Sequence, residues 1–490
     1  MPIVKLPINT GMVQAVDEIG LSTHGASMTD VYVDELGNIN RRPGLVEFCD
    51  LGTSAKVDGL YWFNQKACII AVSNGDAFVI TDSLGTVSAL TMSGPPVDTD
   101  FVTGTRVTFA DFGSDGSDGY YSCFAANGNK IHKILYNIGL AVWAPVTDMA
   151  DADAPTVVTH VAFLDRYLLA NEAATGNFHH ADVGSPSAWG GNYNEAEASP
   201  DDLVALLVAN REIYCLGKNS LEIFYNDGSS PFSRLSQGYV QRGTVAPYSF
   251  HYVNSQDALV WLDEYRQVVA AQGRTPVPLS LTMTKYIQSF SVVTDCIGDY
   301  VELTGRPYSV FRFPTEGKTL AFDYTTKNWY EWGNWNSGTA TYDAFRGNCY
   351  AYSPDWNLTL VGDRANGKVY KFDSSTYTDN AGILRSSVRT AHYNHDTEVA
   401  RKYCNALYMR VKRTSVVAVD GTPDLLVRYR DNGKTTWTDY ADVTLQQVGG
   451  TEFRGKLTRL GSYYSRQWEF VLSDAYPLCL VSVEEDVEIE

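Results

Sequence analysis

Short segments in which apolar and polar residues alternate, each followed by a tight turn, make up most of the chain. In Cys68–Ile80, Tyr121–Ile134 and Leu358–Phe372, two such runs flank an Asn-Gly dipeptide. Asn and Gly tolerate the positive φ that two-residue hairpin turns require, so the pattern predicts antiparallel β-hairpins. Similar turn signals are Asn-Gly at position 432 and Asp-Gly at positions 58, 115, 118, 227 and 420.

Units of hairpin size recur between about residue 56 and residue 375, and they include Val161–Asp182, Ile213–Tyr225, Ala258–Gln272 and Thr319–Trp332. Repeats of about 40–50 residues are typical of β-propellers, whose blades are small antiparallel sheets. A short helix is expected around Thr284–Ser291. The sequence therefore predicts an all-β fold with a β-propeller-like array of about six or seven sheets, and a pair of β-sandwiches is the alternative.

The end of the chain is built differently. Residues 376–400 are polar and irregular, which is typical of a domain boundary. Strands are expected at Ala406–Lys412, Leu425–Arg430 and Trp468–Leu472, and they predict a β-sandwich-like domain. Val483, Val487 and Ile489 alternate with acidic residues, so the tail reads as a strand with one solvated face, the alternative being a disordered acidic tail. The expected domains are an N-terminal extended segment with first strands (1–55), the propeller-like domain (56–375) and a C-terminal β domain (376–490).

Composition narrows the function classes. Aromatic residues make up 12% of the chain and charged residues only 19%, a balance that favours half-buried sheets over charged helices. The formal net charge of −19 argues against binding nucleic acid by neutralising phosphates. Residues 385–490 hold 14 Lys+Arg and 15 Asp+Glu, which leaves 24 and 42 for residues 1–384. Residues 1–384, which include the expected propeller, therefore carry nearly all of the net negative charge.

The eight cysteines are far apart in sequence and read as buried thiols of a reducing compartment. We expect no secretory signal and no membrane-spanning segment, because the apolar runs are too short. Gly362–Lys368 resembles a phosphate-binding loop, but Val369 replaces the residue that would bind magnesium. A calcium loop at Asp111–Gly119 and a zinc site at His392, His395 and Asp396 are alternatives to plain surface loops. We predict no catalytic residues, no cofactor and no metal ion.

Several landmarks appear in a fixed order along the chain. They are Met1-Pro2-Ile3 with Leu6-Pro7, Arg42-Pro43-Gly44, Ser220–Tyr225 with Glu222 and Phe224, Pro231-Phe232, Gln241–Pro247 with Gly243, and the C-terminal Arg428, Arg430, Arg454, Arg459 and Arg466. In this combination the chain resembles the packaged-DNA stabilisation proteins, also called tail hub or nozzle proteins, of short-tailed bacteriophages. The acidic 98–120 region and the asparagine-poor first fifty residues depart from the family pattern.

The resemblance implies a non-enzymatic virion protein, assembled in the host cytoplasm and located in the virion tail. It implies a homohexameric ring below the portal and its adaptor protein, which extends the DNA channel, retains the genome with a tail needle or plug, and anchors tailspikes or fibres. DNA would pass without sequence-specific binding, and the surplus carboxylates would partly line the channel so that DNA does not adhere.

Under the same resemblance, Arg42, Pro43, Gly44, Glu222, Phe224, Gln241, Gly243 and Pro247 are structural motif residues. Arg428, Arg430, Arg454, Arg459 and Arg466 are candidates for docking neighbouring tail proteins, so a chain without residues 385–490 is expected still to form its ring but to attach the neighbouring tail proteins more weakly. Two alternatives stay open: a propeller that binds a receptor or glycan, and a propeller glycosidase with carboxylates clustered in an axial pocket.

Overall fold

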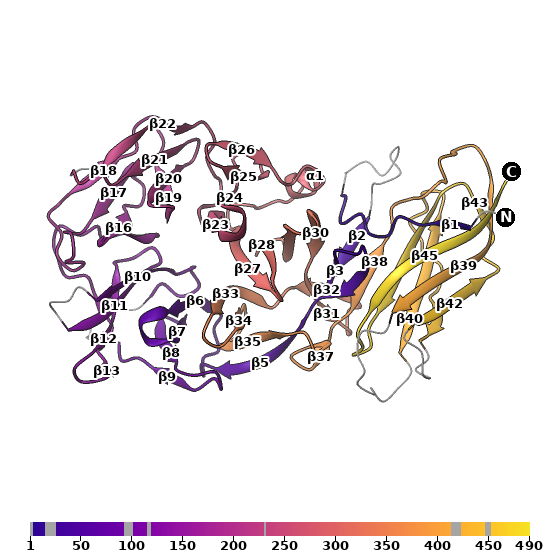
Figure 1. Ribbon diagram of the computed structural model, residues 1–490, viewed down its shortest axis with the longest axis horizontal. Coiled ribbons are helices and arrows are strands. Elements are labelled where there is room, and N and C mark those ends of the chain that lie inside the picture. The colour runs from indigo at the N-terminus through magenta and orange to yellow at the C-terminus, as the bar shows by residue number, and fades with distance from the viewer. Residues whose placement is uncertain are drawn as a thin grey trace.

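Antiparallel β-sheets surround one axis in the first part of the molecule, and a β-sandwich lies beside them (Figure 1). The computed structural model describes residues 3–14, 26–92, 101–114, 119–229, 232–412, 423–445 and 452–490. Met1, Pro2, Pro231, the Asp-Gly turns at 115 and 420, and residues 115–118 of the candidate calcium loop lie outside these ranges. The predicted all-β fold, with a propeller-like array and a C-terminal sandwich, is confirmed.

Seven antiparallel units form the ring within the described residues, and each is given starting with the strand nearest the axis. Six of them have four strands and the second has five. The first two are β6 (Val57–Phe63), β7 (Cys68–Ser73), β8 (Asp76–Ile80) and β9 (Val87–Ala89), then β10 (Thr108–Ser114), β11 (Tyr120–Ala126) and β12 (His132–Asn137), which pairs with β13 (Val142–Trp143) and β14 (Thr147–Asp148). The third and fourth are β15 (Val161–Leu164), β16 (Tyr167–Asn171), β17 (Asn177–His180) and β18 (Tyr193–Glu195), then β19 (Leu203–Ala209), β20 (Glu212–Gly217), β21 (Leu221–Tyr225) and β22 (Ser233–Val240).

The remaining units complete the circle. The fifth is β23 (His251–Val253), β24 (Ala258–Leu262), β25 (Val268–Gln272) and β26 (Thr275–Pro278), and the sixth is β27 (Ile297–Leu303), β28 (Arg306–Phe313), β29 (Lys318–Asp323) and β30 (Asn328–Glu331). The seventh is β33 (Gly347–Ser353), β34 (Leu358–Asp363) and β35 (Lys368–Asp373), completed by β5 (Gly44–Asp50) from the N-terminal part of the chain. The two ends of the propeller are thus joined by hydrogen bonds between β35 and β5.

Apolar side chains fill the wedges between neighbouring sheets. One buried cluster joins the first and second sheets through residues such as Phe63, Val79 and Ile134. Another joins the seventh and first sheets and includes Cys49 of β5 and Ile69. All eight cysteines are buried and none forms a disulfide. Burial of these alternating residues is what requires each sheet to have a neighbour on both sides.

The sandwich consists of two sheets, to which both ends of the chain contribute. One contains β3 (Val31–Val33), β4 (Ile39–Arg41), β45 (Cys479–Ile489), β39 (Lys402–Lys412) and β42 (Glu452–Thr458), with β1 (Ile3–Lys5) and β43 (Ser462–Tyr463) at its margins. The other contains β2 (Ser27–Thr29), β38 (Ser386–Arg389), β44 (Arg466–Leu472), β40 (Asp424–Asp431) and β41 (Ala441–Thr444). The N-terminal segment is therefore an integral part of the sandwich.

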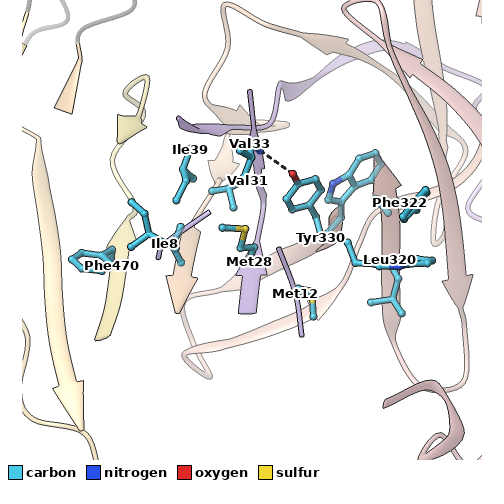
Figure 2. Close-up of a cluster of buried hydrophobic side chains, with 14 of the residues drawn as sticks. Ile8, Met12, Met28, Val31, Val33, Ile39, Leu320, Phe322, Tyr330 and Phe470 are labelled. Atoms are coloured by element: carbon cyan, nitrogen blue, oxygen red, sulfur yellow. Dashed lines mark hydrogen bonds between the residues drawn. The ribbon is translucent and has the colours of Figure 1, made fainter. Parts of the chain in front are cut away.

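The junction between propeller and sandwich is continuous. β30 of the sixth sheet pairs with β2, so one nine-stranded sheet runs from the propeller into the sandwich. Met12, Met28 and Val31 pack between the two parts, and the backbone N–H of Val33 donates to the Tyr330 hydroxyl at 3.0 Å (Figure 2). Removing residues 385–490 would expose this core. The structure therefore gives no support to the expectation that a chain without these residues still assembles into a ring of copies.

Two local predictions from the sequence are confirmed and one is wrong. The turn at Asn74-Gly75 has both residues at positive φ, as predicted, and α1 (Thr284–Gln288) lies where a helix was expected. Asp58-Gly59 was predicted to be a turn, and this is wrong. The dipeptide lies inside β6 at a β-bulge, where a Cβ on Gly59 would approach the Phe109 ring within 2.7 Å. The glycine serves close packing against the next sheet.

Short connecting elements complete the description: η1 (Asn64–Lys66), η2 (Pro247–Ser249), η3 (Asn254–Gln256), the hairpin β31 (Gly333–Asn336) with β32 (Thr341–Ala344), and β36 (Thr378–Asp379) with β37 (Gly382–Ile383). The predicted C-terminal strand is confirmed as β45, with Val483 and Val487 fully buried. Among the described residues, no helix has the length and apolar character needed to cross a membrane.

Candidate functional site

A cavity of about 570 Å³ lies on the propeller axis, and all seven innermost strands contribute to its lining. Its polar lining includes Arg106, which precedes β10, and Asp299 of β27. An Arg106 guanidinium nitrogen, Nη2, forms an ion pair with Asp299, and Nη1 donates to the backbone carbonyl of Asn348 at 3.4 Å. These contacts connect the second, sixth and seventh sheets across the axis.

Burial shifts the pKa of several ionisable groups that line this cavity. Burial raises the pKa of Asp299, and the charge of Arg106 opposes that shift. Burial lowers the pKa of His160 and of His251 to about 4, so both rings are neutral near pH 7. The His251 Nδ1–H donates to the Ser249 carbonyl at 2.9 Å, which leaves Nε2 to accept from the Ser309 hydroxyl at 2.8 Å.

Asp111 is the second carboxylate of the described lining, and it accepts the backbone N–H of Gly113 at 2.9 Å. A glycosidase needs one carboxyl group as an acid and another as a base or nucleophile. Here one carboxylate is held by an arginine and the other by the backbone. The cavity therefore gives the glycosidase alternative no specific support.

Arg42 lies at the junction and joins two buried carboxylates. Its Nε is 2.6 Å from Asp30 Oδ1, and its Nη1 and Nη2 are 3.0 Å and 2.5 Å from the two oxygens of Asp379. All three side chains are at most 2% exposed. Burial raises the pKa of Asp30 to about 7, against the opposing charge of Arg42. We call these residues the Arg42 node.

The rest of the Arg42-Pro43-Gly44 motif is also at the junction. The Pro43 carbonyl accepts from Arg42 Nη1 at 3.1 Å. A Cβ on Gly44 would lie 2.4 Å from the backbone oxygen of Thr378 and 2.6 Å from that of Thr376. Because backbone atoms cannot move aside cheaply, only glycine fits where β5 meets the segment that leaves the propeller.

Glu222 and Phe224 belong to β21 of the fourth sheet. Glu222 is 1% exposed, accepts the backbone N–H of Ala198 at 2.7 Å and pairs with Arg234 Nε at 2.9 Å. Phe224 packs edge-on against Phe178 of the third sheet. Glu222 therefore fastens the fourth sheet to the connection from the third, and Phe224 packs on the third sheet itself.

Gln241, Gly243 and Pro247 lie in the connection from the fourth sheet to the fifth. A Cβ on Gly243 would be 2.2 Å from the backbone carbon of Lys218, and Pro247 is the first residue of η2. Gln241 is exposed. The structure brings Gly243 and Pro247 into a tight inter-sheet turn and leaves Gln241 at the surface.

The five C-terminal arginines do not share one surface. Arg428 and Arg430 lie on β40 of one sandwich sheet, whereas Arg454 on β42 and the nearby Arg459 are exposed on the other. Arg466 is 1% exposed, pairs with Asp431 at 2.6 Å and stacks on Tyr429 and Tyr463. Its guanidinium is thus a core element that no docked protein could reach.

Sequence reasoning missed the partners of these residues. Asp379 and Asp299 lie 337 and 193 positions from the arginines they contact, whereas Asp30 lies 12 positions before Arg42, and none of these carboxylates stands in a recognisable motif. Nothing in the polar stretch Asn38–Gly44 around Arg42 signals that this arginine is buried beside two carboxylates. Of the three tryptophans at positions 329, 332 and 335, Trp329 and Trp332 are each 2% exposed, and Trp335 is half-buried.

The fold places this chain in the class of all-β proteins in which a β-propeller is joined to a β-sandwich. Residues 116–377, just over half of the chain, match the family model described as "Bacteriophage P22 Gp10, beta-propeller". The chain belongs to this family of structural phage proteins, which stabilise packaged DNA.

A search of curated proteins finds no match. Among solved structures, the "Structure of U3-55K" is similar with a TM-score of 0.40 and 10% sequence identity, and the match covers 67% of this chain and 99% of that chain.

Proposed function

We propose that the chain is the subunit of a hub or nozzle ring in a short phage tail. Six copies form the ring below the portal and adaptor, extend the DNA channel, retain the packaged genome with a needle or plug, and anchor tailspikes or fibres. The observation that carries the proposal is the family match over residues 116–377. The subunit is made in the host cytoplasm and is incorporated into the virion.

The propeller axis itself is a poor route for DNA. The Arg106–Asp299 ion pair crosses it, and the space around this pair is the cavity of about 570 Å³ that all seven inner strands line. A duplex therefore has to pass between copies. A closed ring of identical subunits with a head-to-tail interface provides such a passage.

Native mass spectrometry of the purified chain, alone and mixed with the adaptor protein, tests the ring. We expect a species with six times the 54.1 kDa subunit mass. The same stoichiometry is expected when isolated virion tails are disassembled and their proteins are quantified. A monomer or trimer in both preparations would favour a receptor-binding propeller, and absence of the chain from virions would overturn the proposal.

The acidity of residues 1–384 suggests how DNA passes without adhering. We propose that part of the 42 carboxylates against 24 basic side chains faces the channel and repels the phosphates. Hairpin tips alternate between the two faces of the ring of sheets. Asp165, Asp257 and Asp355 are on one face, and Glu172, Asp202 and Glu316 are on the other.

Changing one of these sets to amides is expected to slow DNA release from virions and to alter its salt dependence. The other set, with the same charge change, is the matched control because only one face can line the channel mouth. Release rates measured at several salt concentrations check this. Unchanged rates and unchanged salt response in both variants would contradict the charge mechanism and leave the ring itself untouched.

A further inference from the structure

Arginine and aromatic side chains alternate in a stack on the outer side of the second sandwich sheet. Trp335 packs on Arg385 at 4.3 Å from guanidinium carbon to ring centroid, and Arg385 faces Tyr440 at 5.8 Å. Arg428 follows between Tyr440 at 4.4 Å and Trp437 at 4.9 Å. Arg389 covers the same Trp437 ring at 5.1 Å. We call Trp335, Arg385, Tyr440, Arg428, Trp437 and Arg389 the arginine ladder.

One carboxylate, that of Glu469, lies beneath the arginine ladder in the described part of the chain. Glu469 is 4% exposed, pairs with Arg389 at 2.7 Å and with Arg428, and accepts the Tyr440 hydroxyl at 3.0 Å. Burial acts to raise the pKa of Glu469, but the hydrogen bond and charge of Arg428 and the charge of Arg389 outweigh it and the pKa is lowered. Glu469 is therefore ionised, and the guanidinium groups of Arg389 and Arg428 share its one negative charge, whereas Arg385 donates to the hydroxyls of Ser473 and Tyr440.

The arginines keep part of their surface in contact with solvent. Arg389 is 35% exposed and Arg428 is 25% exposed. Rings on both sides hold the Arg428 plane, so little side-chain entropy is left to lose on binding. Arginines that are fixed in this way, next to Trp and Tyr, are the residue types enriched at protein interfaces. The ladder is thus prepared to accept further carboxylates from a protein surface.

The chain itself offers the complementary surface. Residues 1–384 carry 42 Asp+Glu against 24 Lys+Arg. Glu195 at the end of β18 and Glu197 beside it are both exposed, and a hydrogen bond from Glu197, together with its charge, raises the pKa of Glu195. Two carboxylates this close repel each other, and a cationic partner would relieve the repulsion.

These two surfaces cannot meet within one copy. β18 lies at the edge of the propeller that is farthest from the sandwich, whereas β40 lies within the sandwich (Figure 1). We propose that the arginine ladder binds the acidic propeller edge around Glu195 and Glu197 of a second copy of this chain. The contact joins different patches of two copies, which is the head-to-tail type that closes into a ring. This inference rests on the ring of the proposed function.

Sedimentation velocity of the full chain over a range of concentrations, at low and high NaCl, tests the contact. We expect self-association that weakens with salt. Arg389→Gln leaves Arg428 to hold Glu469, and the paired change Glu195→Gln and Glu197→Gln affects only exposed groups. Each is expected to weaken association about tenfold at low salt, and combining them is expected to add little, because both remove the same contact.

Arg364→Gln is the matched control, since it removes an exposed propeller arginine and is expected to change nothing. If Arg389→Gln does not fold, the paired glutamate variant decides alone. A ring that assembles equally well in all variants overturns this inference and leaves the proposed function standing. Absence of salt-sensitive self-association in the unmodified chain also overturns it, while virion composition decides the proposed function separately. Duplex DNA binding that is lost in Arg389→Gln would assign the ladder to phosphates and overturn the protein contact.

Discussion

Replacing Arg42 with leucine is expected to lower the free energy of unfolding by about 3–5 kcal/mol, because the change leaves two buried carboxylates without their cation. Asp30 and Asp379 are each at most 2% exposed, so water cannot take the place of the guanidinium. Arg42 contacts the sandwich through Asp30 and the end of the propeller through Asp379. Urea denaturation followed by tryptophan fluorescence measures the loss.

Two further variants separate the charge from the packing. Arg364→Leu removes an exposed arginine and is expected to change stability by less than about 0.5 kcal/mol. Combining Arg42→Leu with Asp30→Asn and Asp379→Asn removes the uncompensated charges, so part of the lost stability is expected to return. Equal stability of Arg42→Leu and the unmodified protein would show that the Arg42 node does not hold the junction.

Local pattern was enough to predict the hairpins, because their information is local. Alternation and Asn-Gly turns identify β7 with β8 and β34 with β35 without reference to the rest of the chain. The parity of Val483 and Val487 likewise places β45 with one buried face. That parity also places Glu485 on the buried face, where it is 1% exposed and accepts from His395 Nε2 at 2.8 Å and from the Tyr463 hydroxyl at 2.8 Å.

Long-range pairing could not be predicted from the same signals. Nothing in residues 44–50 says that this strand pairs with β35, more than three hundred positions later, instead of with its sequence neighbour β6. The same holds for β2, whose partners β30 and β38 come from the propeller and the sandwich. Pairing of this kind depends on which edges the assembled sheets leave open, and that is a property of the whole fold.

The site residues also divide into those that local sequence predicts and those that depend on distant parts of the chain. Backbone conformation and close approach explain the roles of Gly44, Gly243 and Pro247. Glycine and proline indicate such roles already in the sequence. The ion pairs of Arg42 and Arg106 depend on residues from other sheets. The C-terminal arginines show the limit most clearly, since Arg466 and Arg428 look alike in sequence and differ in burial and partners.

The second large loss of stability is expected when β5 can no longer close the propeller. Leu45 is 1% exposed and Cys49 is 9% exposed on this strand, on either side of the solvent-facing Glu47. Replacing both Leu45 and Cys49 with aspartate places two unpaired charges in the clusters that hold the seventh sheet. The change is expected to cost at least about 5 kcal/mol and to detach β5 from β35.

Hydrogen exchange measured by mass spectrometry follows that detachment. Backbone amides of β33 to β35 are expected to exchange faster than those of the third and fourth sheets, because the opened ring loses protection first at its seam. Glu47→Gln on the same strand is the control. It removes only the exposed ion pair with Lys368 at 2.6 Å, which contributes less than about 1 kcal/mol. Equal protection across all sheets in the double aspartate variant would mean that β5 is a passive addition, and that the propeller is closed by packing of its sheets alone.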